Sequence, residues 1–327
     1  MSVSFSCVHS KQLVDAEDLN FIHPEDLEAG LTVQDVKVIK IYLSACECSG
    51  TRWALSSLIP YANHACGQRG RWVPDMRQLA GHIKVRQRVV ATAIVYMRRV
   101  YARHSFVSFA PWVLAPACLY LASKAEECCV GAKFVAFYSK KLEEQKRGGG
   151  GGMGYVSEAE LVEMEMLLLE ALDYYLLVFH PYTPAMTYLT DAGLSADLTQ
   201  TCWSLLNDSY RTDLCLLHAP HVIALGCIYL AAQLMDKDIR AWVEDLRLDV
   251  NQVRLGLRLS GGSWGGWGLS GGCWSVGVQI RSVSMELLEF YDKYRQVGDS
   301  TVRAGLAKVR VQRTRLHPHL QTEAWNE

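Results

Sequence analysis

The sequence lacks a large net charge, because its 33 lysines and arginines are balanced by 34 aspartates and glutamates to give −1. A balanced chain has no overall attraction to nucleic acid or to an anionic membrane, so neither is an expected partner. The sequence also lacks an apolar run long enough to span a bilayer, since the longest, residues 222–234, suits a buried helix. Its first residues lack the basic start and apolar core of an export signal, so we expect an intracellular, reduced protein.

Common catalytic motifs are absent as well. There is no Gly-x-Ser-x-Gly elbow and no kinase catalytic loop. The glycine tract at residues 148–152 follows a lysine-rich segment and lacks the Gly-Lys-Ser/Thr ending of a phosphate-binding loop. Cys46, Cys48, His64 and Cys66 are metal-ligand types, but their spacing is unusual for zinc. We therefore expect no catalytic residues, no metal and no cofactor, and a helical binding module rather than an enzyme.

The sequence does contain an internal repeat. Residues 101–124 align without a gap with residues 210–233, and both segments carry Ala-Pro before an apolar stretch that ends in Tyr-Leu-Ala. Cys118 and Cys227 occupy the same position of that stretch, where cysteine acts as a small hydrophobic residue. A helix that is apolar on nearly all sides lies at the centre of a bundle. Two copies of one central helix therefore predict two copies of one helical domain.

Helical periodicity dominates the rest of the sequence and indicates an all-α protein. Ser157 and Glu160 form a capping box that opens one helix, and residues 285–294 form an amphipathic helix. Three segments rich in glycine, serine or tryptophan interrupt the pattern. We interpret them either as looped-out inserts or as translated non-coding sequence. They are residues 46–74, 146–154 and 260–277. The predicted parts are an N-terminal segment (1–30), a first domain (31–178), a second domain (179–297) and a basic tail (298–327).

Several stretches resemble the cyclin family. Two stretches resemble the cyclin box: residues 86–103, which read Arg-Gln-Arg-Val-Val-Ala-Thr-Ala-Ile-Val-Tyr-Met-Arg-Arg-Val-Tyr-Ala-Arg, and residues 121–127, which read Leu-Ala-Ser-Lys-Ala-Glu-Glu. Residues 178–182 and 207–217 are similar, more narrowly, to the C-type cyclins of the Mediator kinase module. The resemblance implies an all-α fold of two tandem five-helix cyclin-box domains with low-complexity insertions. It also implies a nuclear regulatory subunit that activates a cyclin-dependent kinase, acts with the other subunits of that module, and regulates transcription by RNA polymerase II.

The resemblance also implies binding residues. In cyclins, a lysine of the Leu-Ala-Ser-Lys motif and a glutamate of the fifth helix contact the kinase around its C-helix, and they match Lys124 and Glu165 here. We expect both side chains to face solvent and to lie close together. The second copy of the repeat has Gln233 in place of Lys124, which favours a site on the first domain. Of Glu126 and Glu127, we expect Glu127 in particular to meet an arginine cluster that orders the kinase activation segment.

Two alternatives stay open. Tandem cyclin folds also occur in general transcription factors that clamp DNA, where basic residues contact phosphates. The C-terminal candidates for such contacts are Arg303, Lys308, Arg310, Arg313 and Arg315. A helical scaffold without a kinase would be favoured if Lys124 and Glu165 were buried against their own domain. The Met-Arg-Ala-Ile-Leu motif of cell-cycle cyclins is missing near residues 37–41, so substrate recruitment there is not expected.

Overall fold

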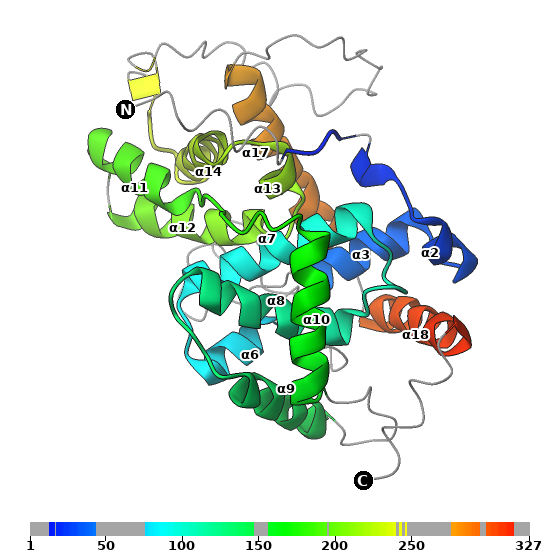
Figure 1. The fold of residues 1–327 in the computed structure, drawn as a ribbon. Helices are drawn as coiled ribbons and strands as arrows, with labels where there is room; N and C mark the ends of the chain where they lie inside the picture. Colours follow the sequence, from blue (N-terminus) through cyan, green and yellow to red (C-terminus); the bar gives the residue numbers. More distant parts are fainter. Residues whose placement is uncertain are drawn as a thin grey trace. The chain divides into compact units, whose positions relative to one another are not determined.

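The computed structural model describes residues 13–16, 18–43, 76–146, 156–194, 196–239, 242–243, 246, 276–294 and 299–316. Every regular element among these residues is a helix (Figure 1), which confirms the all-α prediction. The helices are η1 (Asp18–Asn20), α2 (Pro24–Glu28), α3 (Val33–Leu43), α6 (Met76–Ile83), α7 (Gln87–Arg103), α8 (Pro111–Ala125), α9 (Ala132–Lys146), α10 (Glu158–Ala171), α11 (Tyr182–Asp191), α12 (Ala196–Ser209), α13 (Leu214–Leu217), α14 (Pro220–Leu234), α17 (Val276–Tyr294) and α18 (Asp299–Leu316).

These helices divide into two compact units. One contains α2, α3, α6 to α10 and α18, and the other contains α11 to α14 and α17. We call them the α8 unit and the α14 unit after their central helices. α8 packs against α6, α7, α9 and α10 (Figure 1), and α14 packs against α11, α12, α13 and α17.

The two central helices are built alike. Proline starts each of them, at a position where its missing N–H costs no intrahelical hydrogen bond. Small side chains are buried along both, such as Ala117 and Cys118 in α8 and Cys227 in α14. Small residues let neighbouring helices approach closely, which suits a helix with partners on several sides. The prediction that these are equivalent buried helices is confirmed.

The central helices also end in the same way. Glu127 after α8 has φ +54° and Asp236 after α14 has φ +50°, both in the left-handed region. The N–H of Cys128 then turns back and donates to the carbonyl of Ser123 at 2.8 Å, and the N–H of Lys237 does the same in α14 at 2.9 Å. This arrangement satisfies carbonyls that the last helical turn leaves without a donor. The repeat therefore includes loop geometry at positions where the residue types differ.

The units differ in how closely the last helix approaches the central one. A Cβ on Gly226 of α14 would lie 2.6 Å from Cγ1 of Val283 in α17, so only glycine fits without a shift. The equivalent position of α8 is Ala117, which tolerates a methyl group beside its own neighbours. Glycine in α14 therefore reflects close packing against α17 rather than a turn.

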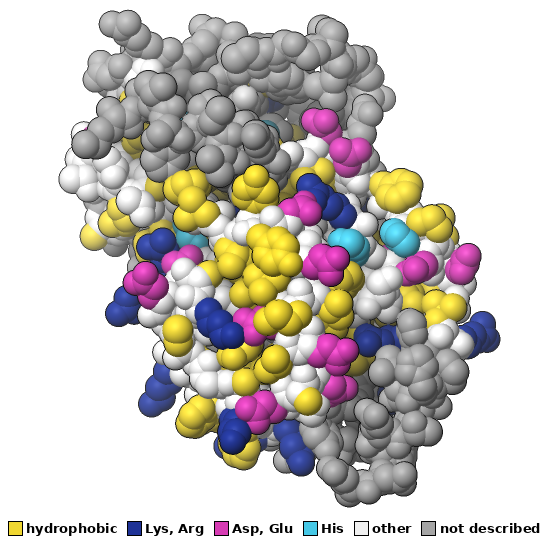
Figure 2. All heavy atoms as spheres, in the orientation of Figure 1, with side chains coloured by type: hydrophobic (Ala, Val, Ile, Leu, Met, Phe, Trp, Pro, Cys, Tyr) yellow, Lys and Arg dark blue, Asp and Glu magenta, His cyan; other side chains and the backbone are white. Residues whose placement is uncertain are grey.

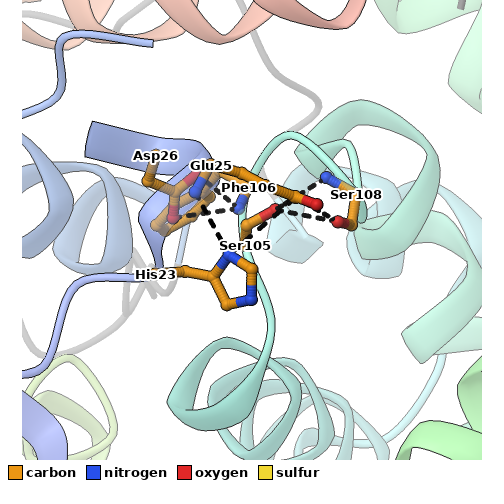
Figure 3. A network of polar contacts seen from close by, with 6 residues as sticks. All are labelled: His23, Glu25, Asp26, Ser105, Phe106 and Ser108. Atoms are coloured by element: carbon orange, nitrogen blue, oxygen red, sulfur yellow. Dashed lines mark hydrogen bonds and ion pairs between the residues drawn. The ribbon is translucent and has the colours of Figure 1, made fainter. Parts of the chain in front are cut away.

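Helix α2 is attached by two carboxylates to the loop between α7 and α8 (Figure 3). Asp26 is 3% exposed and accepts a hydrogen bond from the backbone N–H of Phe106, 3.0 Å from its Oδ1. Glu25 accepts hydrogen bonds from the hydroxyls of Ser105 and Ser108. Burial raises the pKa of Asp26 to about 6, although the backbone hydrogen bond from Phe106 opposes the shift. Part of the predicted N-terminal segment is thus docked on the α8 unit.

The C-terminal prediction is wrong in one respect, because residues predicted as a basic tail form helix α18, which packs against α3. Leu306 and Val309 are buried, three residues apart on one side of the helix. Lys308 donates hydrogen bonds to Asp35 at 3.1 Å and to the carbonyl of Gly30 at 3.0 Å. The dense basic residues concealed this short apolar spacing in the sequence. They do not prevent packing, because Arg310 and Arg315 are exposed and Lys308 is paired with Asp35.

The inserts can be compared with the helices only at their edges. Residues 46–74 lie outside the described part of the chain, and residues 146–154 overlap it only at Lys146, where α9 ends. Helix α17 begins at Val276 rather than at residue 285, so the last two residues of the predicted insert 260–277 are helical. The helix extends back because Ile280 and Val283 supply buried positions before the predicted start.

Candidate functional site

The candidate site of the α8 unit is an ion pair between α8 and α10. Lys124 lies in the last turn of α8, and its Nζ is 2.8 Å and 2.9 Å from the two carboxylate oxygens of Glu165 in α10. The same Nζ lies 4.1 Å from the ring centroid of Tyr120, one turn earlier. Burial acts to lower the pKa of Lys124, but hydrogen bonds to Glu165 and Tyr120 outweigh it and raise the pKa. Lys124 is therefore a charged donor held in place by two neighbours.

The two members of the pair differ in exposure. The Lys124 side chain is 42% exposed, whereas that of Glu165 is 4% exposed. The pair lies close together as expected, but the expectation that both face solvent is wrong for Glu165. Glu165 follows Leu161 by one turn, on the side of α10 that packs against α8, and pairing with Lys124 offsets the cost of burying its charge. The condition that would favour a scaffold without a kinase is therefore met for Glu165 but not for Lys124, which stays exposed.

The two glutamates after α8 have different surroundings. Glu126 accepts a hydrogen bond from the Thr92 hydroxyl at 2.7 Å, and its Oε2 lies 2.6 Å from Nε of Arg88; both partners belong to α7. Its side chain is 11% exposed, so its charge is used within the unit. Glu127 is exposed, and within the described part of the chain its carboxylate makes no hydrogen bond or ion pair. Of the two, Glu127 is the one whose charge can reach a partner.

An apolar stripe on α10 runs beside the ion pair, and sequence reasoning missed it. Val162 is 41% exposed and Met166 57% exposed, and Leu169 continues the line as a half-buried side chain. These three residues, the α10 stripe, flank Glu165 at helical spacing. Figure 2 shows hydrophobic side chains gathered in the middle of the face on which Figure 1 draws α10. The sequence could have indicated this stripe, because the helix that Ser157 caps has apolar residues on more sides than a single buried face would need.

The equivalent end of the α14 unit lacks this charge. Gln233 takes the place of Lys124 and is exposed at the end of α14. A neutral amide cannot form the ion pair that positions Lys124. The combination of a fixed cation, a free carboxylate and an apolar stripe is therefore specific to the α8 unit among the described residues.

The basic residues of α18 are partly engaged within the α8 unit. Lys308 pairs with Asp35, and the guanidinium of Arg313 lies 5.8 Å from the ring centroid of Trp112. Burial lowers the pKa of Arg313. Arg310 and Arg315 are exposed, and the side chain of Arg303 lies outside the described residues. With two of its cations used to hold α18 in place, this helix is a poor candidate for a DNA clamp.

The described ranges contain neither a cluster of potential metal ligands nor a helix that could span a membrane. No group of three or more potential ligands (histidine, cysteine, aspartate or glutamate) comes together there. Cys46, Cys48, His64 and Cys66 lie outside those ranges. None of the described helices is both long and apolar enough to cross a membrane.

Known proteins show similarity over most of this chain. The profile of the family described as Cyclin, N-terminal domain, matches residues 66–177. Cyclin-C1-1 of Oryza sativa subsp. japonica is 39% identical over 290 residues, covering 88% of this chain and 88% of that protein. Cyclin-C1-1 of Arabidopsis thaliana is 39% identical over 302 residues, covering 92% of this chain and 95% of that protein. The resemblance inferred from the sequence is confirmed.

The fold is shared with solved structures. A chain of the CAK complex of Chaetomium thermophilum bound to ATP-gamma-S aligns with a TM-score of 0.55 and 15% identity, over 97% of this chain and 94% of that one. At such low identity the likeness concerns the fold alone. It supports the predicted arrangement of two tandem helical domains, each with its own central helix.

Proposed function

Because the chain belongs to the cyclin family and is similar to Cyclin-C1-1 proteins over most of its length, we propose that it is the regulatory subunit of a cyclin-dependent kinase. Its role is then binding rather than catalysis. The observation that carries the proposal is the Lys124–Glu165 pair, fixed beside the exposed α10 stripe. The charged pair suits the exposed backbone groups at the end of a partner helix, and the α10 stripe suits an apolar side of that helix.

The mechanism is a shift in the kinase's conformational population. A cyclin-dependent kinase alone holds its C-helix displaced, so the glutamate of that helix does not pair with the lysine that orients ATP. A surface that binds the inward position of the C-helix stabilises the active arrangement by its difference in affinity for the two positions. The α10 stripe supplies apolar area for that contact, and Lys124 supplies a donor for carbonyl groups at the helix end.

Glu127 extends the proposal to the kinase activation segment. Many kinases order that segment by gathering arginines around a phosphate. A carboxylate supplies part of the same negative charge and accepts hydrogen bonds from guanidinium groups. Glu127 is exposed just beyond α8, whereas Glu126 is held by Arg88 and Thr92. We assign the arginine contact to Glu127 and a structural role to Glu126.

We also propose a cellular setting, which the similarity to Cyclin-C1-1 proteins supports. A protein of this kind acts with the other subunits of the Mediator kinase module, in the nucleus, on transcription by RNA polymerase II. Purification of the tagged chain from nuclear extract, followed by identification of the bound kinase and its companions, tests it. Recovery of a cell-cycle kinase without Mediator subunits would contradict the assignment.

The kinase interface is tested by binding measurements with the kinase that co-purifies. Lys124→Ala/Glu165→Gln should weaken the affinity at least tenfold, because truncating a charge desolvated at an interface costs about 2–5 kcal/mol. Gln233→Ala, at the equivalent position of the α14 unit, is the matched control and should leave the affinity unchanged. Helical circular dichroism of each variant separates lost contacts from lost folding. Equal affinity of the double variant and the wild type would place the interface elsewhere.

The role of Glu127 is tested by kinase turnover at saturating concentrations of this protein. Glu127→Gln should lower turnover while binding is largely kept, because the carboxylate acts on the activation segment rather than on the C-helix. Glu126→Gln is the comparison, and its effect should appear in thermal stability instead, since its carboxylate joins α8 to α7. If neither variant changes turnover, Glu127 has no part in activation.

A further inference from the structure

Tyr120 lies against the cation of the proposed kinase contact. It belongs to α8, one helical turn before Lys124, and it is 9% exposed. The ammonium nitrogen of Lys124 lies 4.1 Å from the centroid of its ring. A cation at this distance from an aromatic face is attracted by the electron density of the ring. The ring therefore contacts the part of Lys124 that a partner would use.

The core of the α8 unit sets the position of the Tyr120 ring. α8 packs against α6, α7, α9 and α10, and Leu119 and Leu121 on either side of Tyr120 are buried. Protein interiors are close-packed, so a buried ring has little freedom to move. The side chain of Lys124, by contrast, is 42% exposed. The contact thus joins a residue that is fixed by packing to one that packing leaves free.

Glu165 by itself does not fix the ammonium group. A lysine is a point charge on a flexible four-carbon stem, and a carboxylate accepts hydrogen bonds from several directions. The two oxygens of Glu165 lie 2.8 Å and 2.9 Å from Nζ of Lys124. Glu165 belongs to α10, whereas Tyr120 belongs to α8. Contacts from two helices leave the nitrogen fewer positions than a contact from one.

We propose that Tyr120 is a positioning residue, which holds the ammonium group of Lys124 where the kinase binds it. This inference rests on the proposed kinase contact and adds the residue that prepares it. Ordering a long side chain at an interface consumes part of the binding free energy, and a side chain that is held beforehand avoids that loss. Tyr120 therefore raises the affinity through Lys124 rather than through a contact of its own.

The internal repeat supplies a comparison within the same chain. Tyr229 occupies the equivalent position of α14 and is 7% exposed. Gln233 follows it one turn later, where α8 has Lys124. A tyrosine at this position is thus buried in both central helices, whether the next turn carries a lysine or a glutamine. The same substitution at the two tyrosines therefore separates packing from positioning.

The test compares variants of Tyr120 in binding to the kinase that co-purifies with the protein. Tyr120→Leu keeps an apolar side chain but removes the ring, and should weaken the affinity about threefold to tenfold. Tyr120→Phe keeps the aromatic face and should retain most of the affinity. Tyr229→Leu is the matched control and should bind like the wild type. If thermal melting shows that Tyr120→Leu does not fold, Tyr120→Met, which keeps more of the volume, takes its place.

Nuclear magnetic resonance reports on the contact itself. In protein labelled at lysine, the ε-methylene protons of Lys124 should lie upfield of those of exposed lysines, because the ring current shields protons above an aromatic face. Lys124→Met identifies the signal by removing it. The upfield shift should persist in Tyr120→Phe and in Tyr229→Leu, and disappear in Tyr120→Leu. A tyrosine that acts only through packing would not produce this pattern.

Three results overturn the inference but leave the proposed function intact. The first is wild-type affinity of Tyr120→Leu when Lys124→Ala/Glu165→Gln binds weakly. The second is an equal loss from Tyr120→Leu in the wild type and in Lys124→Met, which would show that the ring acts through packing. The third is an equal loss of affinity in Tyr229→Leu. Full affinity of Lys124→Ala/Glu165→Gln would instead remove the proposed kinase contact, and this inference with it.

Discussion

Removing Lys124 alone should cost more stability than removing the charge of both members of the ion pair. In Lys124→Ala the carboxylate of Glu165, 4% exposed, loses the ammonium group that lies 2.8 Å away. Breaking a buried ion pair from one side costs about 3–5 kcal/mol, because the remaining charge is uncompensated. Since Lys124 is 42% exposed, water reaches the vacated position, and we expect a smaller loss. The expected loss is about 1–3 kcal/mol in the free energy of unfolding.

The double variant Lys124→Ala/Glu165→Gln removes that uncompensated charge. Its amide keeps the shape of the glutamate side chain and needs only ordinary hydrogen-bond partners. We expect it to be within about 1 kcal/mol of the wild type, and hence more stable than Lys124→Ala alone. The two substitutions are therefore expected to be strongly non-additive. This also makes the double variant the better reagent for the kinase-binding test, because it loses the site with little loss of folding.

Urea unfolding followed by circular dichroism measures this difference directly. The signal reports the whole fold, since every regular element in the described part of the chain is helical. The wild type, both single variants and the double variant form one thermodynamic cycle, and Gln233→Ala serves as a control for surface truncation at a helix end. A double variant that loses the sum of the two single losses would contradict this expectation, because additivity would mean that the two charges do not interact.

Three further predictions concern packing and pH. Asp26→Asn should stabilise the protein at neutral pH by about 1–2 kcal/mol. Because the pKa of Asp26 is raised to about 6 in the folded protein, the contribution of this carboxyl group to stability is complete below pH 3.8 and is lost as the pH rises through 6. Thermal unfolding at several pH values should show this trend in the wild type but not in Asp26→Asn. Gly226→Ala should lower the free energy of unfolding by about 1–3 kcal/mol, because the added methyl group clashes with Val283. Ala117→Gly, at the equivalent position of α8, should lower it by about 1 kcal/mol, and the two losses can be compared from the denaturant midpoints of unfolding. Leu306→Ala should cost about 2–5 kcal/mol and increase hydrogen exchange in α3, which α18 covers; unchanged exchange would contradict that packing.

The parts of the fold that sequence reasoning predicted are those set by local patterns. The central helices are apolar on nearly all sides, which has few structural meanings other than burial within a bundle. The capping box is equally local: Ser157 N–H donates to Glu160 at 2.8 Å, and Glu160 N–H donates to Ser157 at 3.2 Å. The family resemblance then selected Lys124 and Glu165, and the structure places them within bonding distance.

The parts that were missed depend on distant packing. Glu165 is buried because α10 packs against α8, and the residues next to Glu165 in the sequence do not indicate that burial. Asp26 is buried by a loop that lies eighty positions further along the chain. Helix α18 carries only a short apolar side among many arginines, so its partner α3 decides that it packs. In each case the deciding contact joins residues that are far apart in the sequence.

The pairing of α3 with α18 has a consequence for biosynthesis. Every helix of the α14 unit lies between these two helices in the sequence, so the ribosome completes that unit before it delivers α18. At a rate of synthesis of about 5–20 residues per second, an interval on the order of tens of seconds separates the synthesis of α3 from that of α18. During that interval the side of α3 that bears Ile39, fully buried in the finished protein, is open to chaperones or to other nascent chains. Among the described helices, the one that completes the α8 unit is therefore synthesised after every helix of the α14 unit.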